Sequence, residues 1–138
     1  MQASFNHAYI QINIGVIFKE MDKYSVFGEL TLNIEGKDYI TDVAVYPKLS
    51  VNYHRDIIKV TDMPLLIVEI LSPTQGMQEI IDKFAVYFNA GVKSCWLVQP
   101  YGQSVMVWKS PDESKHFVEG EISDQVLGLN IPVHKVFE

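Results

Sequence analysis

The sequence predicts an α/β protein with a mixed β-sheet flanked by helices, and three observations carry this prediction. Residues 65–71 are apolar except for Glu69, which indicates a strand buried on both faces. Residues 77–89 place apolar side chains at helical spacing, and residues 93–99 return to a strand pattern. A strand, a helix and a strand in this order most simply make the two strands parallel neighbours in one sheet.

Length, composition and charge limit the classes of protein to which this chain can belong. A chain of 138 residues fits one domain, 1–138, and no stretch approaches the roughly 20 apolar residues that span a bilayer, so we expect a cytoplasmic protein. The one cysteine, Cys95, rules out an internal disulfide, and its "SCWLV" setting indicates a buried strand. A net charge of −6 argues against a surface that coats nucleic acid. It still allows a local groove that gains positive charge from a divalent cation.

The first half of the chain yields a helix and a hairpin. Residues 8–22 show apolar side chains both in alternation and at helical spacing, and the length of the segment favours a helix. In "GELTLNIEGKDYITDVAVYP", residues 28–47, two alternating runs meet at "EGKD" and predict a β-hairpin. Residues 48–63 are of mixed polarity and indicate a long connection before strand 64–71.

The second half continues from helix to strands. Ile80, Ile81, Phe84 and Phe88 share one stripe of the predicted helix, and Gly91 stands where a helix takes its left-handed cap. Strands are predicted at 93–99 and 104–110, and "HFVEGE" predicts a short edge strand. The predicted order is therefore helix, three strands, helix and further strands.

Three ionisable residues stand out against this framework: Asp42, Glu69 and Lys83. An ion buried without a partner costs several kcal/mol, so Glu69 must lie near a strand end, be paired, or bind something. Asp42 would share a strand face with Ile40 and Ala44. If its strand lies beside residues 64–71, Asp42 and Glu69 point into one cleft. Two carboxylates with water and a phosphate oxygen suit Mg²⁺, and the Lys83 ammonium would orient water or stabilise phosphate charge.

At these residues the sequence resembles a known family. "TDVAVYP" with "PLLIVEILSPT", followed by "EIIDKFAVYFNAGVKSCWLVQP" and the final "LGLNIPVHKVFE", resembles the Uma-two group of restriction endonucleases. That group belongs to the PD-(D/E)XK nuclease superfamily. The resemblance covers nearly the whole chain. It implies a restriction-endonuclease-like αβββαβ core, cleavage of DNA phosphodiester bonds dependent on Mg²⁺ or Mn²⁺, and homodimers.

The resemblance also implies roles for single residues. Asp42 and Glu69 match the family's two acidic metal ligands, and the carbonyl of Ile70 completes such a site. The superfamily's usual lysine, two residues after the glutamate, is Leu71 here, and in this branch its role maps onto Lys83. Gln99 and Ser94 replace acids that the family often carries, without removing a proposed metal ligand.

Plainer interpretations stand beside these roles. Asp42 could cap the hairpin or pair with Lys37, and Lys83 could pair with Glu79 four residues back for about 0.3–0.5 kcal/mol. Ser72 indicates either a helix cap or a turn before Pro73. The remaining candidates have ordinary structural explanations. We expect His54 and Arg55 in an exposed loop and Trp96 and Trp108 in the core. His7, His116 and His134 are scattered and lack the spacing of metal ligands.

Two functions remain open. The first is a DNA endonuclease dependent on Mg²⁺ or Mn²⁺ that uses Asp42, Glu69 and Lys83. The second is a catalytically inactive module that keeps the nuclease fold and binds nucleic acid or a protein partner. The acidic charge keeps the second open, whereas a glutamate in an apolar strand favours the enzyme.

Overall fold

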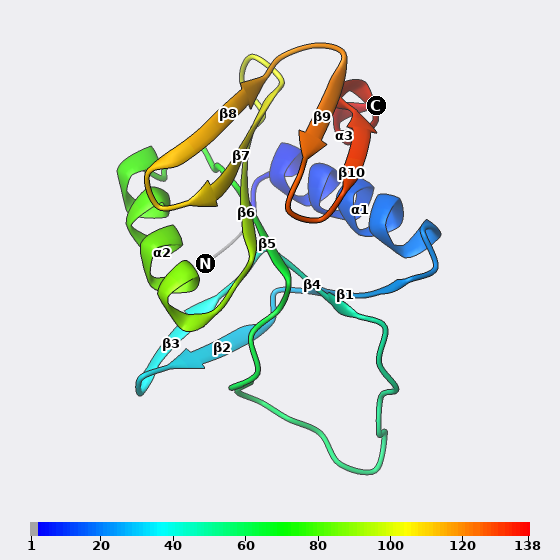
Figure 1. Ribbon diagram of the computed structural model, residues 1–138, viewed down its shortest axis with the longest axis vertical. Coiled ribbons are helices and arrows are strands. Elements are labelled where there is room, and N and C mark those ends of the chain that lie inside the picture. The colour runs from blue at the N-terminus through cyan, green and yellow to red at the C-terminus, as the bar shows by residue number, and fades with distance from the viewer. Residues whose placement is uncertain (1–2) are drawn as a thin grey trace.

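The computed structural model describes residues 3–138 (Figure 1). The first helix, α1 (Phe5–Glu20), begins after Ser4, whose Oγ accepts a hydrogen bond from the His7 backbone N–H at 3.2 Å. The helix predicted for residues 8–22 is confirmed, and it starts three residues earlier than predicted. Its buried side chains recur every three or four residues, at His7, Ile10, Ile14 and Phe18.

A six-stranded sheet forms the centre of the molecule. Its strands, in spatial order, are β1 (Tyr24–Gly28), β4 (Val43–Pro47), β5 (Leu66–Ile70), β6 (Ser94–Gln99), β7 (Ser104–Ser110) and β8 (Glu113–Phe117). The β5–β6 pair is parallel and all other pairs are antiparallel, so the predicted mixed sheet and its parallel pair are confirmed. Helix α2 (Met77–Ala90) connects the two parallel strands, as such a crossover requires.

The strands that precede α2 differ in number and arrangement from the three strands that the sequence predicts. The sequence did not reveal β1, a five-residue strand directly after α1. The predicted hairpin is present as β2 (Thr31–Ile34) and β3 (Lys37–Ile40), but these strands form a separate two-stranded sheet. Without this hairpin, the order α1, β1, β4, β5, α2, β6 is the αβββαβ core that the family resemblance implies.

The prediction that one strand continues through Asp42 is wrong. The chain leaves the hairpin at Thr41, whose backbone N–H and hydroxyl both donate to the Leu30 carbonyl at 3.0 Å. Asp42 therefore lies in a break between β3 and β4. It does not continue a strand face shared by Ile40 and Ala44, since Ile40 is 61% exposed and Ala44 is fully buried.

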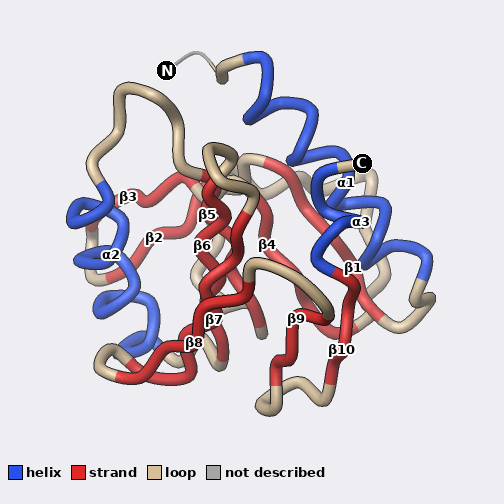
Figure 2. The backbone as a smooth tube through the Cα atoms, turned by 90° about the horizontal axis from the view of Figure 1, so that it is seen from above, coloured by secondary structure: helices blue, strands red, loops and turns tan. Residues whose placement is uncertain are grey.

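Two apolar layers cover the sheet. Helix α1 lies on one face together with α3 (Val133–Phe137), and α2 lies on the other (Figures 1 and 2). Leu66, Val68 and Ile70 of β5 pack into the cluster that contains α1, whereas Ile67 packs into the cluster that contains α2. Because successive strand residues point to opposite faces, Glu69 points toward α2.

Helix α2 ends as predicted. Ile80, Phe84 and Tyr87 are its buried side chains, and Gly91 follows it with a φ of 112°. A residue with a Cβ rarely adopts this left-handed conformation, so glycine is suited to end the helix here.

The C-terminal part holds elements that the sequence left unassigned. The predicted edge strand "HFVEGE" is β8, which runs from Glu113 to Phe117 and so begins and ends earlier than predicted. Two short strands, β9 (Glu121–Asp124) and β10 (Leu129–Pro132), then pair with each other before α3.

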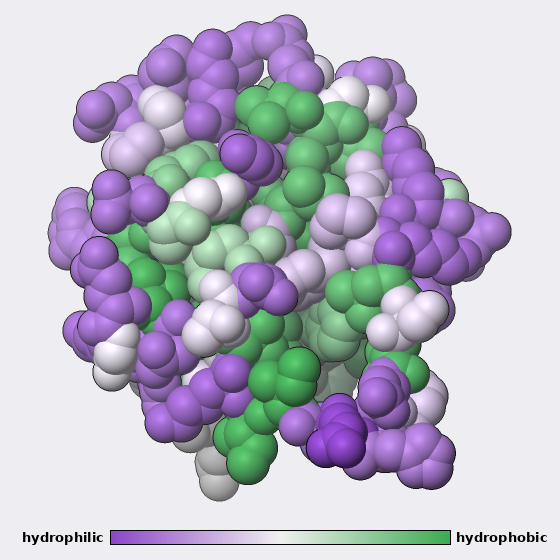
Figure 3. Space-filling model, turned by 60° about the horizontal axis from the view of Figure 1, so that its bottom comes forward, coloured by the Kyte–Doolittle hydropathy of each residue, from purple (hydrophilic) through white to green (hydrophobic). Residues whose placement is uncertain are grey.

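The predicted long connection between β4 and β5 is confirmed, with a single bridge from Val60 to Leu32. It projects from the lower end of the molecule in Figure 1. Figure 3 turns this end forward and shows apolar patches between polar side chains. The connection exposes several large apolar side chains, namely Leu49, Val51, Tyr53, Ile57 and Ile58. Within residues 3–138, no helix is long and apolar enough to cross a membrane.

Candidate active site

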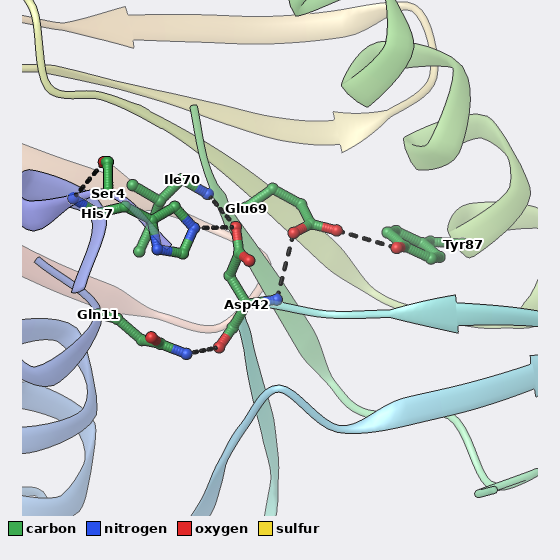
Figure 4. Close-up of polar contacts among 7 residues, drawn as sticks. All are labelled: Ser4, His7, Gln11, Asp42, Glu69, Ile70 and Tyr87. Carbon is green, nitrogen blue, oxygen red and sulfur yellow. Dashed lines mark hydrogen bonds and ion pairs between the residues drawn. The ribbon is translucent and has the colours of Figure 1, made fainter. Parts of the chain in front are cut away.

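Asp42 and Glu69 lie side by side at the ends of two neighbouring strands. The antiparallel register pairs Val43 with Val68 and so brings the preceding Asp42 next to Glu69. The Asp42 backbone N–H donates to Glu69 Oε2 at 3.2 Å, and the Ile70 backbone N–H donates to Asp42 Oδ2 at 2.7 Å (Figure 4). The structure thus brings together the two acids that the sequence singled out.

Glu69 is the more deeply buried of the two acids. Its side chain is 4% exposed, and Tyr87 of α2 donates its hydroxyl to Glu69 Oε1 at 3.0 Å. Burial raises the pKa of Glu69 well above its usual value, and the charge of Asp42 raises it further. The positive charge of Lys83 and the Tyr87 hydrogen bond act in the opposite direction and favour the ionised form.

His7 is a residue of this site that the sequence analysis left among the scattered histidines. Its Nε2 lies 3.1 Å from Asp42 Oδ2, and the ring is buried. The hydrogen bond to Asp42 raises the pKa of His7, against the opposing effect of burial. A signal was present in the sequence, because His7 continues the stripe formed by Ile10, Ile14 and Phe18. A polar residue on an apolar helix stripe needs a partner in the core.

Helix α1 holds Asp42 at a second point. Gln11, one turn after His7, donates its side-chain amide to the Asp42 carbonyl at 2.8 Å. Figure 4 shows His7 and Gln11 approaching Asp42 from one side and Glu69 leading to Tyr87 on the other. The Asp42 backbone and carboxylate are therefore fixed by α1 and β5 together.

Lys83 lies on α2, half-buried, and lines one cleft of about 700 Å³ together with Asp42 and His7. Glu79, Asp82 and Asp38 also line this cleft, which makes its wall acidic. Within the described part of the chain, no carboxylate forms an ion pair with Lys83, so the alternative pairing with Glu79 is not present. Asp42 likewise pairs with His7 and not with Lys37, whose ammonium lies over the Tyr39 ring.

The chemistry of this site fits a divalent cation with few protein ligands. Residues 3–138 contain no cluster of three or more His, Cys, Asp or Glu side chains that could hold a metal. The two adjoining carboxylates are the oxygen donors that this site offers to a cation. Asp42 Oδ1 accepts no hydrogen bond from the described residues, and a carboxylate buried beside another carboxylate favours a nearby positive charge. Such a set suits Mg²⁺, which keeps several waters and takes one or two carboxylates.

The other sequence candidates lie outside this arrangement. Ser72 forms the predicted turn, because its carbonyl accepts from the Gln75 backbone N–H at 3.1 Å. Ser94 donates its hydroxyl to Asp124 of β9 at 2.5 Å, and Trp96 donates to the same oxygen at 2.8 Å. The core positions predicted for Cys95, Trp96 and Trp108, and the exposed positions of His54 and Arg55, are confirmed.

Comparison with known proteins agrees with this fold. The model of the family Uma2, described as "Putative restriction endonuclease", matches residues 1–134. The chain is also similar to a crystal structure described as "a putative nuclease belonging to DUF820 from Anabaena variabilis", with a TM-score of 0.84 and 20% sequence identity. That similarity covers 99% of this chain and 83% of the other, and it confirms the predicted fold. A search of curated proteins gave no match.

Proposed function

Because this chain belongs to the Uma2 family, we propose that it is an endonuclease that hydrolyses phosphodiester bonds in DNA with Mg²⁺ or Mn²⁺. The observation that carries the proposal is the adjoining pair of carboxylates, Asp42 and Glu69, of which Asp42 lines the cleft and Glu69 is buried directly behind it. A purely structural role would not explain why Glu69 is buried beside a second acid, since that position raises its pKa.

In this proposal Asp42, Glu69 and the Ile70 carbonyl hold the cation. A cation held there would lower the pKa of a water molecule and offset charge on the phosphate. His7 and the Ile70 N–H keep the Asp42 carboxylate in place, and Tyr87 does the same for Glu69. These hydrogen bonds fix both carboxylates before the substrate arrives, which limits reorganisation during the reaction.

Lys83 supplies the protein's own positive charge in this proposal. The position that usually carries the superfamily lysine is Leu71, which packs into the apolar cluster beneath α2. Lys83 lines the same cleft as Asp42, and its charge acts on Glu69. In this proposal its ammonium stabilises negative charge on a phosphate bound near the two acids. We expect this ammonium to lie closer to the Glu69 carboxylate than to that of Glu79.

A cleavage assay tests the function. We expect the purified protein to cut plasmid DNA with Mg²⁺ or Mn²⁺ and not in EDTA. Asp42→Asn and Glu69→Gln should each lower the rate by roughly a hundredfold or more, because each removes a charged ligand. The exposed Glu119→Gln is the matched control. Equal rates for Glu69→Gln and the control would contradict the proposal.

A second function is supported by the charge of the molecule. The alternative is a catalytically inactive module that binds nucleic acid or a protein partner, and the net charge of −6 and the acidic wall of the cleft favour the protein partner, because acidic side chains repel phosphates. Calorimetric titration with Mn²⁺ separates the two. Binding that is lost in Glu69→Gln favours the nuclease, and no binding by the wild type favours the module.

We further propose a cytoplasmic homodimer. Ile12 and Val16 of α1 are largely exposed and, with Val26 and Phe27 of β1, line a groove of about 490 Å³. Strand β1 is also an edge of the six-stranded sheet. An exposed apolar surface beside an open sheet edge suits a second copy of the chain.

A further inference from the structure

A second groove, of about 940 Å³, adjoins the cleft that contains Asp42. Three segments form its walls: the start of α1 (4–6), the chain after β5 (71–75) and the β6–β7 turn (99–103). In Figure 2 these segments gather toward one end of the sheet. The groove is within the size range of pockets that bind small molecules.

The groove connects to the proposed active site through two segments. Ser72 lines both the groove and the cleft, and it lies only two residues after Ile70. On the other side, Ser4 lines the groove and accepts the hydrogen bond from the N–H of His7, whose ring contacts Asp42. A strand cleaved beside Asp42 would therefore meet the groove within a short distance of the cut.

The lining of this groove is neutral. Its described lining residues include no Asp, Glu, Lys, Arg or His, whereas four amide side chains line it, those of Asn6, Gln75, Gln99 and Gln103. A surface that binds the phosphate backbone needs Lys or Arg side chains, because these neutralise the phosphates. Amides instead supply donors and acceptors of the kind that pair with the edges of nucleobases.

Two aromatic side chains stand at the groove and are almost entirely exposed: Phe5 at 88% and Tyr101 at 99%. Tyr101 lies in a four-residue turn in which the Gln103 N–H donates to the Pro100 carbonyl at 3.1 Å. Gly102 has a φ of 88°, as a type II turn requires at its third position. This tight turn holds Tyr101 outward on a fixed backbone. Exposed aromatic rings are the usual platforms on which unpaired bases stack.

We propose that this groove binds unpaired nucleobases next to the cleavage site, so that the protein acts on single-stranded DNA or on the unpaired arm of a DNA junction. The inference rests on the proposed function and specifies its substrate class. Bases of a continuous duplex are stacked on each other and cannot reach a neutral groove that lacks phosphate contacts. Unpaired bases can stack on Phe5 or Tyr101 while their edges meet the amides.

Binding in EDTA tests the groove apart from cleavage. The probe is a fluorescent single-stranded DNA of about 12 nucleotides, within the usual site sizes, beside a duplex of the same sequence. We expect the wild type to prefer the single strand, Tyr101→Ala to weaken its binding about tenfold, and Tyr101→Phe to retain it. Tyr53→Ala is the matched control, because Tyr53 is 92% exposed but does not line the groove.

The outcomes separate the two proposals. No preference for the single strand, no binding at all, or equal losses for Tyr101→Ala and Tyr53→Ala would overturn the base-binding groove. Absence of metal-dependent cleavage of any DNA would overturn the nuclease and leave the binding result in EDTA standing. When both hold, Tyr101→Ala should slow cleavage of a single strand by a similar factor through a raised KM, because its ring does not touch the carboxylates.

Discussion

At the scale of single residues, Glu69 determines how this site responds to pH. Its carboxylate accepts hydrogen bonds from Tyr87 and from the Asp42 backbone, yet its pKa is raised because burial and the Asp42 charge outweigh these contacts. Two donors therefore do not replace the water that Glu69 loses on folding. The site is arranged for an additional positive charge.

The stability of the metal-free protein should fall as pH rises. Glu69 has a folded pKa above its unfolded value of about 4.5, so between these values the native state binds more protons than the unfolded state. The raised pKa of His7 acts with the same sign, since its contribution is complete below about pH 6.5 and lost as pH rises through its folded pKa. Urea unfolding in EDTA at a series of pH values above about 4.5 measures how the free energy of unfolding changes with pH. Glu69→Gln should flatten this dependence, and a stability that rises with pH would contradict the account.

His7 should act as a positioning residue for Asp42. His7→Gln removes the ring that contacts Asp42 Oδ2. Loss of a group that orients a metal ligand typically costs about 10–100-fold in metal affinity or activity. Calorimetric titration with Mn²⁺ and the cleavage rate measure both effects. The exposed His116→Gln is the control, and equal Mn²⁺ affinity in both variants would show that His7 does not support Asp42.

At the scale of elements, α2 brings two side chains of the proposed site to one face. Lys83 and Tyr87 are four residues apart, so they lie one above the other on the helix. Tyr87 reaches Glu69 directly, and Lys83 acts on it through its charge. The apolar stripe that packs α2 on the sheet therefore also sets the direction of these two groups.

Lys83→Ala should separate catalysis from metal binding. We expect cleavage to fall by roughly a hundredfold or more, because a charge near the phosphate is lost. Mn²⁺ affinity and the urea midpoint should stay near those of the wild type. Lys115→Ala, on the exposed strand β8, is the matched control. Unchanged cleavage in Lys83→Ala would exclude this lysine from the reaction.

Two glycines should respond to alanine with opposite signs. A Cβ at Gly91 or at Gly15 would meet no atom within 4 Å, so neither substitution causes a clash. Gly91 has a φ of 112°, and alanine there should lower the free energy of unfolding by about 1 kcal/mol. Gly15 lies inside α1, where alanine should raise the free energy of unfolding by about 0.5–1 kcal/mol. Urea unfolding at one protein concentration gives both values, and equal signs would contradict the role of Gly91.

At the scale of the whole molecule, the two sheet edges differ. Strand β8 carries mostly exposed polar residues, which protect an edge, whereas β1 adjoins the apolar groove of α1. Ile12→Ser combined with Val16→Ser should convert the proposed homodimer to a monomer in light scattering. Val118→Ser, also at an exposed apolar residue, is the control. A wild type that is monomeric at all concentrations would refute the dimer.

The sequence by itself determined the elements whose signals are local. The helical stripe of α2, the left-handed position of Gly91, the buried strand β5 and the turn of the hairpin each depend on residues within a few positions of each other. Repeating side-chain patterns record such neighbours directly. Glu69 was also visible, because a charge within an apolar strand is costly without a purpose, whereas the role predicted for Asp42 depended on the resemblance to the family. The single domain, 1–138, stays a prediction.

The tertiary structure alone decided which distant residues meet. His7 and Asp42 are 35 positions apart, and Ser94 and Asp124 are 30 apart, so no local pattern links them. The break at Asp42, where the chain passes from the hairpin to the central sheet, exists because the two sheets pack separately. Likewise, the neutral groove arises from three segments that only the packing of α1 and the β6–β7 turn brings together. Such contacts form because whole faces of helices and strands are buried against each other. A sequence pattern shows which face of an element is apolar, but it does not show which other element packs against that face.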